Sequence, residues 1–257
     1  MNMLLTNDDG YKAKGFYALL KELSNHFNVT AVAPTSQKSW IGKSISKEKE
    51  LLLSKTKLKE FEIYTLDGTP ADCVQIGIYD VLNNRPQLVI SGINMGLNTG
   101  HGRILSSGTI GASMEASIDG IKSISSSIHI PKDIKSLDSK ESVFQNAAKI
   151  TVKIIKIFLD NKFPDNVDLL SINIPFDATI NSEIEITKPH REPYGKLFHK
   201  KEKKFIHITP AINFNDLKNG TDLKALNEGK ISVTPISLEL IPNDSLEQVS
   251  KILSHNW

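Results

Sequence analysis

The chain has 257 residues, of which 31 are Lys or Arg and 29 are Asp or Glu, so its formal net charge is +2. This balance argues against a nucleic-acid polymer as partner, because proteins that bind the phosphate backbone carry a strong basic excess. Cys73 is the single cysteine, which excludes an internal disulfide and a cysteine-based zinc site. We expect a cytoplasmic protein with no signal peptide and no membrane partner, because carboxylates occur by position 8 and no apolar run approaches membrane-spanning length.

Apolar patterning predicts strands and helices in alternation. Short apolar runs indicate strands at 3–6, 28–33, 62–66, 88–90, 121–128 and 168–174. Apolar spacing of three and four residues indicates helices that include 16–23, 74–82, 108–118 and 143–154. A Gly-rich loop is expected before the helix at 108–118, and the Ser/Lys-rich stretch 123–142 is interpreted as an exposed loop. The alternation predicts an α/β fold with a doubly wound, mostly parallel sheet.

The pattern changes after Pro175. Four segments have β-like patterns without helical spacing between them, at 183–187, 196–199, 205–209 and 231–234. The spacing over 246–253 predicts a short terminal helix. We interpret 1–175 as the catalytic domain and 176–257 as a C-terminal β-rich arm with a terminal helix. Because this arm has little apolar core of its own, we expect it to pack against another subunit.

Two adjacent carboxylates, Asp8 and Asp9, follow the first predicted strand. Such carboxylates repel each other unless a cation neutralises them, and a hard divalent cation prefers oxygen ligands. Ser39 and Asn94, which lie in polar segments near two other strand ends, could supply hydroxyl and amide oxygens to the same ion. The sequence Asn-Asp-Asp-Gly is also typical of a turn, so a metal site and a simple turn both stay open.

Two further polar segments open predicted helices. Thr69-Pro70-Ala71-Asp72 has the residues of a helix N-terminus, and we favour that structural role. Ser107-Gly108-Thr109 places a hydroxyl and free backbone N–H groups at the start of the next helix. Such a start binds anions in some proteins and is only a capped helix end in others, and both interpretations stay open here.

The chain resembles the SurE family, the survival-protein family of metal-dependent nucleoside monophosphate phosphatases, over nearly its whole length. The residues that carry the resemblance are MNMLLTNDDGYKAKGF, AVAPTSQKSWIGKSIS, LDGTPADCV, LVISGINMGLNTG and SSGTIGASMEA. The resemblance implies a Rossmann-like fold whose C-terminal arm is exchanged between the subunits of a homodimer, with some dimers pairing into homotetramers. It implies that one divalent cation, Mg²⁺ or Mn²⁺, is bound by Asp8, Asp9, Ser39 and Asn94. It also implies that phosphate is bound by Asn98, Ser107, Gly108 and Thr109.

The implied activity is hydrolysis of nucleoside 5′-monophosphates, extending to 3′-nucleotides and short polyphosphate, with Asp8 and Asp9 as catalytic residues. The cation would act as a Lewis acid and activate a water. Trp40 stands where many members have Gly, and His101–Ser106 differs from the acidic and Tyr-containing run of many members; both departures bear on substrate preference. Two alternatives are a phosphatase that uses Asp8 as a covalent nucleophile and a non-catalytic nucleotide-binding protein. The adjacent spacing of the two Asp residues argues against the first, and the intact ligand set argues against the second.

Overall fold

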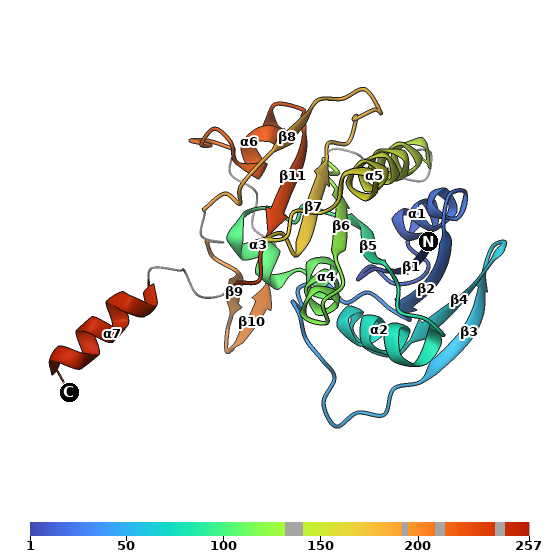
Figure 1. Cartoon of the computed structure of the whole chain (residues 1–257), viewed down its shortest axis with the longest axis horizontal. Helices are drawn as coiled ribbons and strands as arrows, with labels where there is room; N and C mark the ends of the chain where they lie inside the picture. Colours follow the sequence, from blue (N-terminus) through green and yellow to red (C-terminus); the bar gives the residue numbers. More distant parts are fainter. Residues whose placement is uncertain (132–140, 192–194, 209–213, 240–244, 257) are drawn as a thin grey trace.

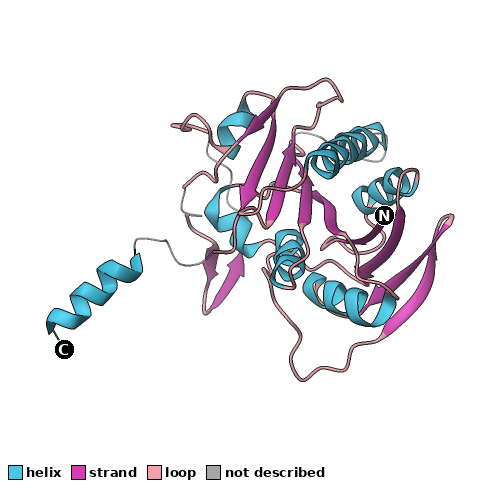
Figure 2. Ribbon diagram, in the orientation of Figure 1, coloured by secondary structure: helices cyan, strands magenta, loops and turns pink. Residues whose placement is uncertain are grey.

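A sheet of nine strands crosses the centre of the molecule in the computed structural model, which describes residues 1–131, 141–191, 195–208, 214–239 and 245–256. Helices cover both faces of this sheet (Figures 1 and 2). The strands in spatial order are β3 (Leu53–Leu58), β4 (Phe61–Leu66), β2 (Asn28–Pro34), β1 (Asn2–Thr6), β5 (Leu88–Met95), β6 (Ser123–Ile128), β7 (Leu169–Ile174), β11 (Ile231–Ile236) and β8 (Ile184–Ile186).

The six strands from β4 to β7 in this spatial order are mutually parallel. β3 pairs antiparallel with β4, β11 pairs antiparallel with β7, and β8 runs parallel to β11. The prediction of an α/β fold with a mostly parallel sheet is therefore confirmed. Within the described residues, none of the helices is both long and apolar enough to cross a membrane.

Two apolar cores lie on opposite faces of the sheet because neighbouring residues of a strand point to opposite sides. Met3 and Leu5 of β1 belong to the core under α1 (Lys14–Ser24) and α5 (Glu141–Asn161). Leu4, between them, belongs to the core under α2 (Pro70–Ile76) and α4 (Gly108–Ile118). Full burial of a side chain of this size contributes about 1.5–3 kcal/mol, so β1 is fixed from both sides.

Three local predictions are corrected. β5 continues past Ile90 to Met95, so Gly92 and Asn94 lie inside the strand rather than in a loop after it. The expected Gly-rich loop contains the short helix α3 (Gly100–Ser106). The strand predicted at 121–128 is confirmed as the fully buried β6, so the interpretation of 123–142 as an exposed loop is wrong for its first residues; residues 132–140 lie outside the described residues.

The C-terminal part is more closely joined to the sheet than its sequence pattern indicates. β8 and β11 are strands of the main sheet, and α6 (Asp222–Asn227) lies between β10 and β11, where no helix was expected. The pairing of β9 (Phe198–Lys201) with β10 (Lys204–His207) forms a separate hairpin, and α7 (Ser245–Asn256) projects from the body (Figure 1). The division at residue 175 and the exchange of an arm between subunits stay predictions.

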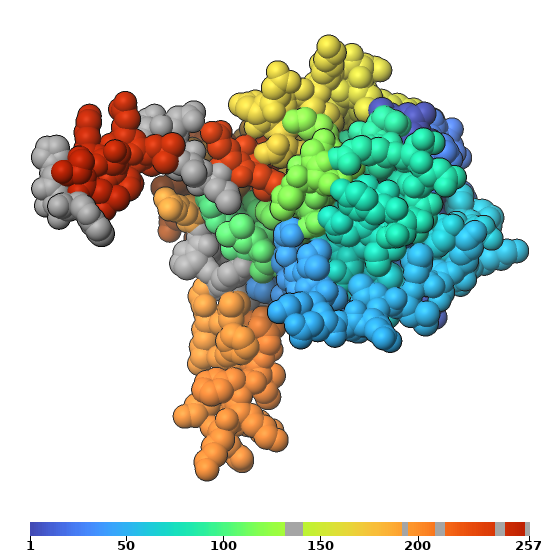
Figure 3. All heavy atoms as spheres, turned by 60° about the horizontal axis from the view of Figure 1, so that its bottom comes forward, coloured from blue at the N-terminus to red at the C-terminus, as the bar shows by residue number. Residues whose placement is uncertain are grey.

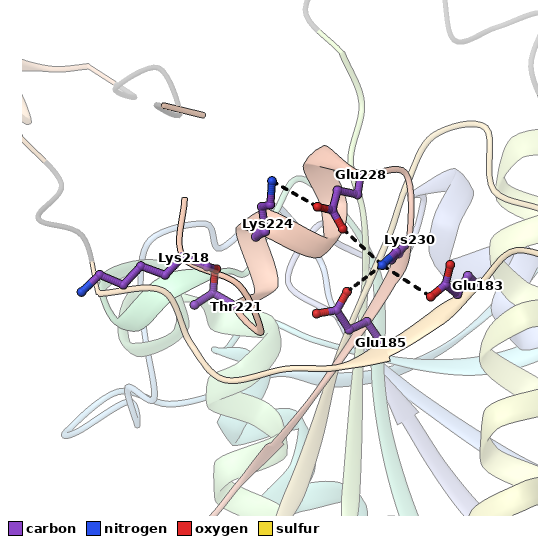
Figure 4. Close-up of polar contacts among 7 residues, drawn as sticks. All are labelled: Glu183, Glu185, Lys218, Thr221, Lys224, Glu228 and Lys230. Carbon is purple, nitrogen blue, oxygen red and sulfur yellow. Dashed lines mark hydrogen bonds and ion pairs between the residues drawn. The ribbon is translucent and has the colours of Figure 1, made fainter. Parts of the chain in front are cut away.

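An ion-pair network joins β8, α6 and β11 at the edge of the sheet (Figure 4). The Lys230 ammonium lies 3.3 Å from Glu185, 3.4 Å from Glu183 and 3.2 Å from Glu228. Lys224 lies 3.1 Å from the other oxygen of Glu228. Hydrogen bonds from Lys224 and Lys230 lower the pKa of Glu228, and the neighbouring carboxylates, Glu228 first, raise the pKa of Lys230.

We expect Lys230→Met to lower the melting temperature slightly at pH 7, because these groups are partly exposed and solvent screens their attraction. The difference should disappear as the pH falls below 4.5, the ordinary pKa of Glu228, and through its lower folded value, because the carboxylate then loses its charge. Melting curves between pH 3 and 8 measure this, with Lys57→Met on the exposed edge strand as the matched control. An equal loss at every pH would show that the lysine acts through packing alone.

Candidate active site

The candidate site lies at the carboxyl edge of the sheet, between β1 and β5. The chain winds from β1 to β2 and β4 on one side, and from β5 to β6 and β7 on the other. Such a reversal leaves a crevice outside the strand ends, where ligands bind in open α/β sheets. Asp8 and Asp9 follow β1 after one intervening residue, Asn7, and Asn94 lies near the end of β5.

Asp8 is a buried carboxylate, with 4% of its surface exposed. The Thr109 hydroxyl donates to its Oδ1 at 2.6 Å, and the Thr109 backbone N–H also bonds to it. The backbone N–H of Lys38 donates to the Asp8 carbonyl at 2.7 Å. Burial, and then repulsion from Asp9, raise the pKa of Asp8 to about 7, although the bonds from Thr109 oppose this shift. The charged form of Asp8 is therefore disfavoured without a cation.

Asp9 brings the loop after β2 and the end of β5 together. Its Oδ2 accepts a hydrogen bond from the Met95 backbone N–H at 2.9 Å, and its Oδ1 accepts one from the Gln37 amide at 3.4 Å. The same Gln37 nitrogen lies 2.9 Å from the Ser39 hydroxyl oxygen. The Asn94 amide nitrogen donates to the Gly96 carbonyl at 2.9 Å, which leaves its amide oxygen as the possible ligand atom. Burial raises the pKa of Asp9 as well.

The four predicted ligands Asp8, Asp9, Ser39 and Asn94 thus lie on three segments that hydrogen bonds hold together. Two carboxylates with raised pKa values, a hydroxyl and an amide oxygen form an all-oxygen donor set, which suits a hard divalent cation. Within the described residues, no group of three or more His, Cys, Asp and Glu side chains gathers to hold a metal. The side chain of Gln37, which the sequence analysis did not single out, joins Asp9 to Ser39.

The start of α4 packs directly on Asp8. The Ser107 hydroxyl accepts a hydrogen bond from the Ile110 N–H at 3.1 Å, so its capping role is confirmed. A Cβ on Gly108 would lie 2.9 Å from both the Asp8 Cβ and the Lys38 carbonyl oxygen, and only glycine fits there. Because Thr109 donates to Asp8, these three residues position the carboxylate; phosphate binding by them stays a prediction.

Asn98 lies in a buried polar network beside the strand ends. Its amide nitrogen donates to the Ser127 hydroxyl at 2.8 Å, and its backbone N–H donates to the Asn173 side-chain oxygen at 2.9 Å. Asp222 on α6 accepts from the backbone N–H of Gly100 at 2.7 Å and of His190 at 2.9 Å. These bonds tie the loop after β5 to β6, β7 and the C-terminal part, and the sequence analysis identified neither Asn173 nor Asp222.

The loop that carries Ser39 is fixed to α4 by an ion pair between an exposed lysine and a buried glutamate. The Lys43 ammonium lies 2.5 Å from Glu115, whose side chain is only 6% exposed. The other oxygen of Glu115 accepts from the Gln75 amide at 2.5 Å. The Gly42 backbone N–H donates to the Ser106 carbonyl at 2.9 Å.

The predicted helix start at Thr69–Asp72 is confirmed and also supports this loop. The Thr69 hydroxyl accepts from the Asp72 N–H at 3.0 Å, and the Asp72 carboxylate accepts from the Thr69 N–H at 2.8 Å. The remaining bonds reach the loop, since Thr69 donates to the Ser44 carbonyl at 2.6 Å and Asp72 accepts from the Ser46 N–H at 3.0 Å. A local capping box therefore also fixes a segment more than twenty residues away.

In chelator, we expect the wild-type protein to lose stability as the pH rises from about 4 through about 7. The ordinary pKa of Asp8 is 3.8 and its folded value is about 7, so the folded state binds the proton more tightly and is favoured at low pH. The shift corresponds to a loss of roughly 4 kcal/mol in the free energy of unfolding. Asp8→Asn should remove most of this dependence in urea unfolding at pH 5 and 8.

Asp80→Asn is the matched control, because this carboxylate is exposed and belongs to the helical turn Gly77–Val81 that follows α2, not to a segment that carries a predicted ligand. It should keep the wild-type dependence on pH. An equal decline in Asp8→Asn and wild type would contradict the assignment of the titration to Asp8.

Comparison with known proteins places these features in a family. Residues 3–196 match the family model described as survival protein SurE. The proteins named 5′-nucleotidase SurE of Methanococcus vannielii and Methanocaldococcus jannaschii are both 41% identical to this chain; the alignments cover 93% of this chain in each case, and 93% and 92% of the relatives. The crystal structure of the SurE protein from Aquifex aeolicus superposes with a TM-score of 0.80 at 32% identity, covering 99% of this chain and 100% of that one. The chain belongs to the survival protein SurE family.

Proposed function

We propose that the protein is a 5′-nucleotidase that requires a divalent cation, Mg²⁺ or Mn²⁺, and releases phosphate from nucleoside 5′-monophosphates. The observation that carries the proposal is the pair of adjacent carboxylates at the carboxyl edge of the sheet, Asp8 buried and Asp9 partly buried, both with raised pKa values. The relatives named 5′-nucleotidase SurE support the same activity. We extend the proposal to 3′-nucleotides and short polyphosphate, as the family resemblance implies.

Asp8, Asp9, Ser39 and Asn94 would hold the cation. When bound, it would polarise the phosphoryl oxygens of the substrate. Burial of Asp8, and the engagement of its Oδ1 by Thr109, favour a ligand role over that of a covalent nucleophile.

The phosphate of the substrate would lie at the start of α4. The partial positive charge of the helix N-terminus attracts anions, and α4 has eleven residues aligned behind Ser107. Gly108 allows the helix to approach Asp8 closely, which places this anion-attracting end beside the carboxylates. Asn98, held by Ser127, would orient a further phosphate oxygen.

Exhaustive chelation should abolish phosphate release, and added Mn²⁺ or Mg²⁺ should restore it. The assay measures phosphate released from a panel of nucleoside 5′-monophosphates, 3′-nucleotides and short polyphosphate over a metal titration. Full activity after chelation would contradict the proposal, as would tight nucleotide binding without turnover at every metal concentration.

Asp9→Asn tests the ligand set within the same assay. The change is nearly isosteric but removes a negative charge, so both the apparent metal affinity and the rate should fall. We expect the rate to drop more than about tenfold, or roughly 1.4 kcal/mol of barrier. Asp80→Asn should behave as wild type. A wild-type rate for Asp9→Asn at all metal concentrations would reject Asp9 as a ligand.

We also propose that the protein forms homodimers and that some of these dimers pair into tetramers. In this assembly, α7 would pack on a second copy of the chain. α7 projects from the body (Figure 1), and its apolar side chains are more than half exposed in the single chain. These side chains are Leu246, Val249, Ile252 and Leu253. Burial of such a stripe contributes most of the stability of a helix interface.

Light scattering at micromolar concentration should therefore report a dimer or a larger species. Val249→Glu should weaken the assembly, because it places a charge on the apolar stripe. Gln248→Glu, its neighbour, adds the same charge at a polar position and should leave the assembly unchanged. A wild-type monomer would contradict this proposal without affecting the catalytic one.

A further inference from the structure

Trp40 has an unusual backbone conformation directly beside a predicted metal ligand. It follows Ser39, its φ is 60°, and 37% of its surface is exposed. A bulky side chain rarely adopts a positive φ, because its Cβ crowds the backbone, whereas glycine does so freely. The indole therefore stands at a position where glycine would be less strained, and its contacts with other rings are the compensating interactions.

The Trp40 ring is the first member of an aromatic cluster that also contains His207 and Phe198. The Trp40 and His207 rings lie 4.9 Å apart at 66°, and the His207 and Phe198 rings lie 5.6 Å apart at 75°. His207 and Phe198 pair across the β9–β10 hairpin. Figure 3 shows this hairpin as a narrow projection from the body. Edge-to-face contacts of this kind fix the rings relative to one another.

Two hydrogen bonds hold Trp40 close to the candidate site. On one side, the Lys38 N–H donates to the Asp8 carbonyl at 2.7 Å; on the other, the Gly42 N–H donates to the Ser106 carbonyl at 2.9 Å. Trp40 is two residues from each of these points, so its Cα lies within about 7 Å of the Cα atoms of Lys38 and Gly42. The backbone at Trp40 therefore lies between one point bonded to Asp8 and another bonded to Ser106, the last residue of α3, which puts the residue at the rim of the candidate site.

A nucleotide whose phosphate lies at this edge must extend its nucleoside over the neighbouring surface. Aromatic side chains bind nucleobases by stacking, whatever the base, because every base has a π-face. We propose that the base of the substrate stacks on Trp40, supported by His207 and Phe198, and that this contact favours nucleotides over phosphomonoesters without a base. The inference rests on the proposed nucleotidase function and adds a specificity-determining residue to it.

The test compares Trp40→Leu with Trp40→Phe, since both keep an apolar side chain at the same positive φ but only Phe keeps a ring. The substrates are adenosine 5′-monophosphate and ribose 5-phosphate. For the nucleotide, kcat/KM of Trp40→Leu should fall about tenfold through KM, while Trp40→Phe should stay within about threefold of wild type. For ribose 5-phosphate, both variants should match wild type. Melting curves check that each variant is folded.

An equal loss on both substrates would show that the ring only supports the loop, and would overturn the inference, as would no loss on either. Wild-type protein that releases phosphate from neither compound would overturn the proposed function and this inference with it. A second measurement does not depend on the folding of a Trp40 variant. In Trp257→Phe, Trp40 is the single tryptophan, and adenosine but not ribose should quench its fluorescence; equal quenching or none would overturn the inference.

Discussion

Two carboxylates on consecutive residues, Asp8 buried and Asp9 partly buried, lie at the edge of the sheet, and much of the surrounding structure serves to hold them there. Burial raises both pKa values, so folding alone opposes the charged forms. The hydroxyl and N–H of Thr109, the Met95 N–H and the Gln37 amide offset part of this cost. A divalent cation would offset the rest, which is the physical reason to interpret the pair as a metal site rather than a turn.

The site is held rigid by contacts that do not themselves face the carboxylates. The ion pair of Lys43 with the buried Glu115 and the Thr69–Asp72 capping box fix the loop that carries Ser39. Because α2 and α4 pack on one face of the sheet, their positions determine where that loop lies. Disruption of the apolar core on this face would therefore move a predicted metal ligand. Catalytic geometry and the stability of this half of the fold are linked in this way.

The sequence was informative where structure is determined locally. The strand at β1, the helix start at Thr69 and the grouping of polar residues at strand ends all follow from short-range pattern. Long-range pairing was not predictable: β8 and β11 extend the sheet through β7, whose edge no local pattern reveals. β3 was missed because its alternating lysines resemble a solvated loop, although alternation is also typical of an exposed edge strand. The contact of Gln37 with Asp9 joins residues 28 positions apart, and no spacing rule indicates it.

The carboxylates and the aromatic cluster of the candidate site differ in how closely they are joined to the apolar core. The carboxylates follow a strand that is buried on both faces, and α4 packs directly on Asp8. The aromatic cluster instead joins a surface loop to a hairpin whose strands are exposed along their whole length. Substitutions in such a hairpin disturb little of the core, because surface positions away from buried contacts have small effects on stability. Base recognition in this fold can therefore change while the arrangement of the carboxylates stays the same. The four predicted ligands and Trp40 thus lie in parts of the structure that the core constrains to different degrees.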